Sequence, residues 1–255
     1  MKRKNIIVGI ELGYYNARVN YFDEKEENGE RFKPIRFSNQ STSLPLYVDF
    51  NYNPVKIGVK SENAIFGMKR FIGLNYDDPK VQEEITNGHY PFEIVKGEKR
   101  SCSIKFQIGE KNIKISPEEI MAILLRYIKN EIIKYLNVHQ SSRVNAVITI
   151  PYDYTEEQQT KLKEAAEMAG IYLISLLPEP IAAVHKIKGQ HPPDGYYYVF
   201  DLGKDKFIVS CIQSERDGGK LRCIATIDDN QISGNIFDIN FENIYYTIMG
   251  TTRPR

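Results

Sequence analysis

This sequence has almost no net charge, few cysteines and no long apolar run. Lysine and arginine together number 34, against 33 aspartates and glutamates, which leaves a formal net charge of +1. Such an even balance gives no reason to expect a nucleic acid or an anionic membrane as partner. The three cysteines, Cys102, Cys211 and Cys223, show no metal-ligand spacing, and they favour a reducing compartment, the cytoplasm or the nucleus.

Signals for a membrane or for export are equally weak. No stretch approaches the roughly 20 apolar residues that a transmembrane helix needs. Basic residues at 2–4 precede an apolar run at 6–10, but this run is too short for a signal peptide and is broken by Glu11. The 255 residues, 42% hydrophobic and 26% charged, indicate a globular protein of one large or two ordinary domains instead.

Strand and helix signals alternate along the first three quarters of the chain. Residues 5–22 predict a β-hairpin, and residues 144–150 and 172–177 predict buried strands. Two capping boxes, at 116–119 and at 155–158, predict the starts of two helices. Strand, helix, strand and helix in this order predict an α/β layer with a parallel sheet.

A second, shorter series of elements follows the proline-rich segment 190–195, which we take as the domain boundary. Three strands and a closing helix are predicted there, at 196–202, 207–213, 221–227 and 235–249. Its opening residues, Asp201-Leu202-Gly203, repeat the pattern of Glu11-Leu12-Gly13 in the first hairpin. This repetition predicts two related lobes that face each other across a cleft.

Six short motifs carry a family resemblance. They are IVGIELG at 7–13, MKRFIG at 68–73, NAVITIP at 145–151, LPEPIAA at 177–183, FDLG at 200–203, and the pair SG at 233–234 with FD at 237–238. In this order, and across nearly the whole chain, they resemble the actin-like ATPase domain of the seventy-kilodalton heat-shock chaperones. The related actins and sugar kinases share the two lobes but lack the second motif and Glu179-Pro180.

The resemblance implies a fold and a division of the chain. It implies an α/β fold with a ribonuclease-H-like lobe formed by residues 1–38 and 113–188, interrupted by an inserted α+β subdomain at 39–112. Residues 189–255 would then form an incomplete second lobe. The implied cofactors are ATP or ADP with magnesium, and the implied cellular role is that of a chaperone in protein folding.

The same resemblance assigns roles to individual residues. Lys69 would contact the γ-phosphate as a point charge, and Glu179 would orient water; the alternatives are a solvated surface lysine and a helix N-terminal charge. Glu11 and Asp201 would hold magnesium through water. The implied nucleotide-binding set is Gly13, Tyr14, Tyr15, Asp201, Gly203, Lys204, Lys206 and Gly234.

Both phosphate loops depart from the family pattern. Tyr14 and Tyr15 stand where the family has two threonines, and these longer side chains would crowd the space for metal and phosphate. In the second loop, Lys206 replaces a threonine and Ile208 an aspartate, and an isoleucine can neither ligate metal nor accept a proton. Lys204 and Lys206 would either replace magnesium as counter-charges or simply decorate a turn.

Three functions follow from these observations. The first is a chaperone-like nucleotide-binding fragment with ATP or ADP binding weak or lost and hydrolysis impaired, a pseudo-ATPase. The second is a non-enzymatic protein that binds chaperones or co-chaperones, and the third is an active chaperone ATPase. A second lobe of three strands and one helix also leaves a sheet face or edge uncovered, which predicts either self-association or a poorly ordered C-terminal region.

Overall fold

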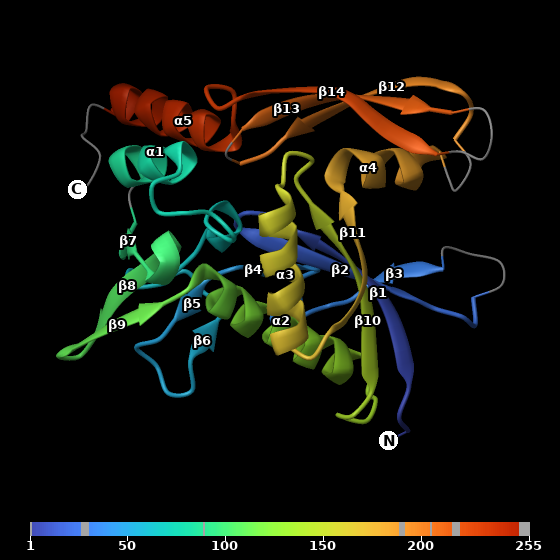
Figure 1. Ribbon diagram of the computed structural model, residues 1–255, viewed down its shortest axis with the longest axis horizontal. Coiled ribbons are helices and arrows are strands. Elements are labelled where there is room, and N and C mark those ends of the chain that lie inside the picture. The colour runs from blue at the N-terminus through green and yellow to red at the C-terminus, as the bar shows by residue number, and fades with distance from the viewer. Residues whose placement is uncertain are drawn as a thin grey trace. The chain divides into compact units, whose positions relative to one another are not determined.

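The computed structural model in Figure 1 describes residues 2–26, 31–88, 90–188, 192–204, 206–215 and 220–249. It divides into two compact units, Met1–Leu177 and Pro178–Arg255. Within the described part of the chain, no helix combines the length and the apolar character needed to cross a membrane.

A twisted sheet forms the centre of the first unit. Its strands lie in the order β11-β10-β1-β2-β3, and β4 also pairs with β2. They are β1 (Asn5–Leu12), β2 (Asn16–Phe22), β3 (Phe32–Pro34), β4 (Ser43–Pro45), β10 (Arg143–Ile150) and β11 (Tyr172–Pro178). The pairing of β1 with β10 is parallel and that of β1 with β2 antiparallel. The predicted opening hairpin and the α/β layer with parallel strands are therefore both confirmed.

Two long helices, α2 (Pro117–Tyr135) and α3 (Glu156–Met168), pack together beside this sheet. Both begin at the predicted capping boxes. The side chain of Ser116 accepts from the Glu119 backbone N–H, and that of Thr155 accepts from the Gln158 N–H. Each N3 side chain reaches back to the backbone of its N-cap residue, so both helix starts are fixed locally by sequence.

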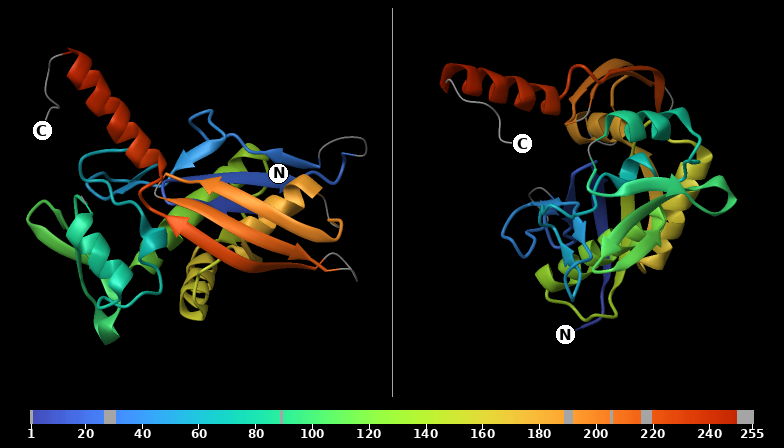
Figure 2. Two further views of the ribbon diagram at one scale, coloured as in Figure 1. Left: turned by 90° about the horizontal axis from the view of Figure 1, so that it is seen from above. Right: turned by 90° about the vertical axis from the view of Figure 1, so that its left-hand side faces the viewer.

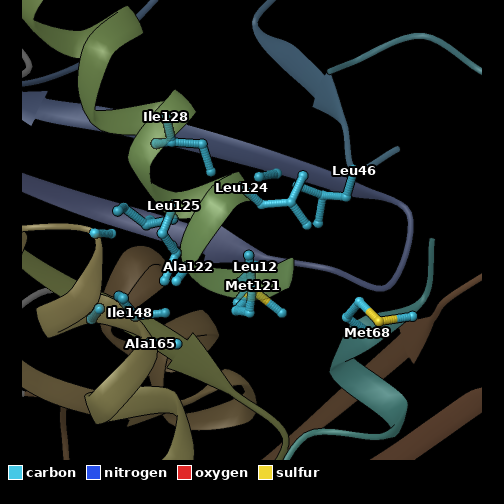
Figure 3. Close-up of a cluster of buried hydrophobic side chains, with 14 of the residues drawn as sticks. Leu12, Leu46, Met68, Met121, Ala122, Leu124, Leu125, Ile128, Ile148 and Ala165 are labelled. Atoms are coloured by element: carbon cyan, nitrogen blue, oxygen red, sulfur yellow. The ribbon is translucent and has the colours of Figure 1, made fainter. Parts of the chain in front are cut away.

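The main core lies between the sheet and these helices (Figure 3). Side chains from β1, β10, α2 and α3 contribute to it, together with Leu46 and Met68 from the segment between β4 and α2. Met68 begins the short 3-10 helix η1 (Met68–Arg70), and Phe71 and Ile72 directly after η1 are also fully buried. The core therefore anchors η1, which carries Lys69.

The segment expected as an inserted subdomain, 39–112, contains both strands and helices. Besides β4 and η1 it holds β5 (Val48–Asp49), β6 (Lys56–Ile57), α1 (Pro79–Asn87), β7 (Glu93–Lys96), η2 (Glu98–Arg100), β8 (Cys102–Ile108) and the start of β9 (Lys111–Ile115). Strands β7, β8 and β9 form their own antiparallel sheet. Two elements depart from this division: β4, inside the expected bounds, joins the central sheet through β2, and β9 continues past residue 112 to Ile115.

The second unit is a three-stranded antiparallel sheet with two helices. Its elements are α4 (Glu179–Lys188), β12 (Gly195–Leu202), β13 (Phe207–Ser214), β14 (Leu221–Asp229) and α5 (Gly234–Met249), so each predicted strand and the closing helix are present. Helix α4 lies against all three strands and buries Ile181 and Val184. This packing groups residues 179–188 with the second unit, whereas the sequence placed them in the first lobe.

Candidate nucleotide-binding loops

The first loop is the tight turn between β1 and β2. The Gly13 N–H donates to the Asn16 carbonyl at 2.9 Å, and a Cβ on Gly13 would lie only 2.8 Å from that same oxygen. The Leu12 N–H donates to Thr149 Oγ1 of β10 at 3.3 Å. Glycine is therefore required at the turn by close backbone approach, and the turn is tied to the neighbouring parallel strand.

Lys69 lies close to this loop and is only 3% exposed, which contradicts the alternative of a solvated surface lysine. Its ammonium is 5.1 Å from the centroid of the Tyr14 ring, within range of a cation–π interaction. The Tyr154 hydroxyl donates to the Lys69 carbonyl at 2.6 Å. Backbone and side chain of Lys69 are thus both held in place within the first unit.

Arg70 contacts several residues around the first loop, a role that the sequence did not indicate. Its guanidinium donates to the hydroxyls of Tyr90 at 2.7 Å and Tyr15 at 3.3 Å, and it lies 3.5 Å from a Glu84 carboxylate oxygen. The same group lies over the rings of Tyr14 and Tyr15, at 5.1 and 5.4 Å from their centroids. The two tyrosines that replace threonines therefore meet the two cations of η1.

Tyr15 also belongs to an aromatic cluster in the inserted segment. Its ring stacks on Phe66 at 5.7 Å between centroids, and Phe66 in turn contacts Tyr47, Tyr90 and Phe92. Burial raises the pKa of the Tyr90 hydroxyl well above its ordinary value, with the neighbouring Glu84 raising it further. The Tyr15 ring is therefore a packing element of the first unit, a role that the comparison with threonine did not reveal.

Glu11 occupies the place of the first-loop aspartate. Its carboxylate pairs with the Arg18 guanidinium at 2.9 Å, directly opposite on β2, and both side chains are more than half exposed. An exposed pair of this kind contributes only about 0.2–1 kcal/mol. The pair nevertheless places a positive charge beside the carboxylate that would hold magnesium.

The second loop connects β12 and β13 in the second unit. The Gly203 N–H donates to the Lys206 carbonyl at 3.0 Å and closes the turn. The Lys206 ammonium lies 3.0 Å from a carboxylate oxygen of Asp228, and the Lys204 ammonium lies 3.5 Å from one of Asp238. Each loop lysine therefore has an acidic partner in its own unit.

The start of α5 is joined to this loop. The Gly234 N–H donates to the Gly203 carbonyl at 3.0 Å, and the Asn235 N–H donates to the Lys204 carbonyl at 2.8 Å. The first amides of a helix are the donors that commonly bind phosphate. Here the loop's own carbonyls accept from these two amides. A Cβ added at Gly234 would lie 3.3 Å from Lys204 Cα, so glycine eases this close approach of the two backbones.

The remaining sequence-predicted residues of the second unit lie on two elements. Asp201 is exposed near the end of β12 and pairs directly with Ile208 across the hairpin. Glu179 is the first residue of α4, where its charge suits the helix N-terminus. Among the residues that the structure describes, no three histidine, cysteine, aspartate or glutamate side chains gather as a metal site.

Comparison with known proteins gives consistent matches. A model of the Hsp70 protein family matches residues 7–252. The chain is 29% identical over 251 residues to the heat shock 70 kDa protein of Neurospora crassa, a match that covers 92% of this chain and 36% of that protein. It is also 29% identical over 242 residues to human heat shock 70 kDa protein 13, covering 91% of this chain and 48% of that protein. The chain thus spans between about a third and a half of these relatives.

Proposed function

Because this chain belongs to the Hsp70 protein family, we propose that it is a chaperone-type nucleotide-binding domain in which ATP or ADP binding is weak or lost and hydrolysis is impaired. The observation that carries this proposal is the state of the second loop. Each of its two lysines is paired with a carboxylate, and the helix amides beside it donate to loop carbonyls.

The first loop fits a nucleotide phosphate better than the second. Gly13 brings the backbone close, and Lys69 supplies a positioned cation. Phosphoryl transfer needs positioning and charge neutralisation more than covalent chemistry from the protein. Lys69 would provide both for the terminal phosphate. Glu11 would reach magnesium through water, in competition with its ion pair to Arg18.

The second loop does not fit the phosphate role. Two of the family's three glycines are replaced, and Ile208 offers no ligand and no base where an aspartate would stand. Asp201 remains as a candidate for the magnesium shell, and Glu179 as a residue that could orient water. Because Ile208 stands in place of the second-loop aspartate, we derive no hydrolytic step for this chain.

A non-enzymatic role in binding chaperones or co-chaperones is the second candidate. It is favoured by the large apolar side chains that the second unit exposes on β12 and α5. We also propose that the chain is located in the cytoplasm or the nucleus. An active chaperone ATPase would require the second loop to work without its threonine and aspartate.

Calorimetric titration with ADP and ATP, each with and without magnesium, tests the proposal. Binding at micromolar affinity, about −8 kcal/mol, would show that the chain still binds nucleotide tightly, whereas we expect much weaker affinity. The variant Y14T/Y15T/K206T/I208D restores the family residues and should recover affinity. Equal, tight and magnesium-dependent binding by the natural chain would refute the proposal. If neither the natural chain nor the variant binds nucleotide, the second candidate, binding of chaperones or co-chaperones, is favoured.

A further inference from the structure

The two tyrosines of the first loop are the central residues of the turn between β1 and β2. The turn is closed by the bond from the Gly13 N–H to the Asn16 carbonyl, and both tyrosines lie outside the paired residues of the two strands. In Figure 2 this hairpin is drawn in blue and the segment around η1, which belongs to the same unit, in teal. Replacing either tyrosine side chain therefore leaves the pairing of β1 with β2 intact.

These two neighbouring side chains have different surroundings. The Tyr15 ring stacks on Phe66 within the aromatic cluster, and the Tyr15 carbonyl accepts from the Leu46 N–H at 2.7 Å. The Tyr14 ring instead faces both cations of η1: the Lys69 ammonium and the Arg70 guanidinium each lie 5.1 Å from its centroid. Tyr15 is thus a packing residue, whereas Tyr14 covers two positive charges.

Both cations are also held by residues outside the loop. The Lys69 carbonyl accepts from the hydroxyl of Tyr154, which is itself 9% exposed. The Arg70 guanidinium donates to the Tyr90 hydroxyl at 2.7 Å and lies 3.5 Å from a Glu84 carboxylate oxygen. Neither cation depends on the first loop alone for its position, so both should stay in place when the loop ring is removed.

The ring and an anion would compete for these charges. A buried ammonium costs free energy unless a negative group offsets it, and Lys69 is 3% exposed. The face of an aromatic ring carries partial negative charge and attracts cations within about 6 Å of its centroid. Phosphate oxygens carry full negative charge and form stronger, charge-assisted hydrogen bonds with lysine and arginine. An anion that reaches both cations must therefore displace the ring.

We propose that Tyr14 is an autoinhibitory residue, whose ring takes the place of a phosphate group on Lys69 and Arg70. Removing the ring opens a site for a polyphosphate chain, either that of a nucleotide or a free one. Such a site needs no divalent metal, because both counter-charges belong to the protein. This inference rests on the proposed function, since it names the residue that weakens phosphate binding at the first loop.

Calorimetric titration of the full chain with inorganic tripolyphosphate in EDTA tests the role of Tyr14. Tyr14→Thr should bind at least about tenfold more tightly than the natural chain, because two cation–π contacts no longer compete with the anion. Tyr14→Phe keeps the ring, so its affinity should stay within about twofold of the natural value. Tyr15→Thr should give no gain in affinity and should unfold at a lower urea concentration, because Phe66 loses its stacking partner.

A double variant locates the site. Tyr14→Thr combined with Lys69→Met should lose the gain, and a gain that survives would overturn the proposal, because the anion would then bind elsewhere. Equal affinity of Tyr14→Thr and the natural chain would also overturn it, as would a similar gain for Tyr14→Phe. Tight, magnesium-dependent binding of ADP by the natural chain refutes the proposed function instead. Weak ADP binding without a gain for Tyr14→Thr refutes the role of Tyr14 alone.

Discussion

Replacing Arg70 by methionine tests whether the tyrosines of the first loop are held by the cations of η1. The Arg70 side chain is mostly buried, donates to two tyrosine hydroxyls and faces Glu84. Hydrogen bonds that involve a charged group contribute about 1.5–3 kcal/mol each, and the partly exposed ion pair with Glu84 contributes about 1 kcal/mol or less. These contributions overlap, and methionine retains the apolar contacts of the stem. We therefore expect a loss of about 3 kcal/mol in the free energy of unfolding.

Urea unfolding followed by far-UV circular dichroism measures this loss, since the chain contains no tryptophan to report by fluorescence. With a slope of about 2–3 kcal/mol per molar urea, the midpoint should fall by roughly 1 M. Arg18→Met is the matched control, because its pair with Glu11 is exposed and should cost less than about 1 kcal/mol. Equal losses for the two variants would refute the reasoning, and so would a loss at Arg70 below about 1 kcal/mol.

Two further predictions concern the first unit. Gly73→Ala should destabilise the chain by about 2–4 kcal/mol, because φ is +68° and a Cβ would lie 2.6 Å from Gln158 Cα. Gly109→Ala, at φ +56° with no atom within 4 Å of the added Cβ, should cost only about 1 kcal/mol in the same urea titration; similar losses would contradict the steric argument. Burial raises the pKa of the Cys102 thiol to about 12, so at pH 8 this thiol should resist iodoacetamide in the folded chain and react after unfolding. Rapid labelling in the folded state, mapped by peptide mass spectrometry, would argue against that burial.

Local sequence signals predicted most of the fold. The capping boxes at Ser116 and Thr155 specify helix starts through contacts within four residues, so no tertiary information is needed to find them. The strands of the second unit were equally visible in the alternation of apolar residues. The local pattern did not predict that α4 packs with the second unit. Its buried residues Ile181 and Val184 lie on a helix that contacts strands β12, β13 and β14, which come later in the chain.

In the candidate site, too, some residues were predictable from the sequence and others were not. The motif around Lys69 was recognisable, and so was the missing carboxylate at Ile208. The roles of Tyr15 and Arg70 were not, because they depend on Phe66, Glu84 and Tyr90, which lie at distant positions in the chain. A substitution read against a family pattern gives the size and chemistry of the new side chain. Which residues the new side chain contacts depends on the groups that the fold brings near it, and these are not visible in the motif.

The two loops have therefore changed in physically different ways. In the first, the residues that replace threonines have gained partners: Tyr14 lies over the Lys69 ammonium and Tyr15 accepts from Arg70. In the second, Lys206 is bound by Asp228 and the loop carbonyls are used by the start of α5. Restoring threonine at position 15 alone should cost stability, since Arg70 and Phe66 both lose a contact. Restoring residues 206 and 208 should cost less, because Lys206 loses a single ion pair with Asp228 and Ile208 is only partly buried.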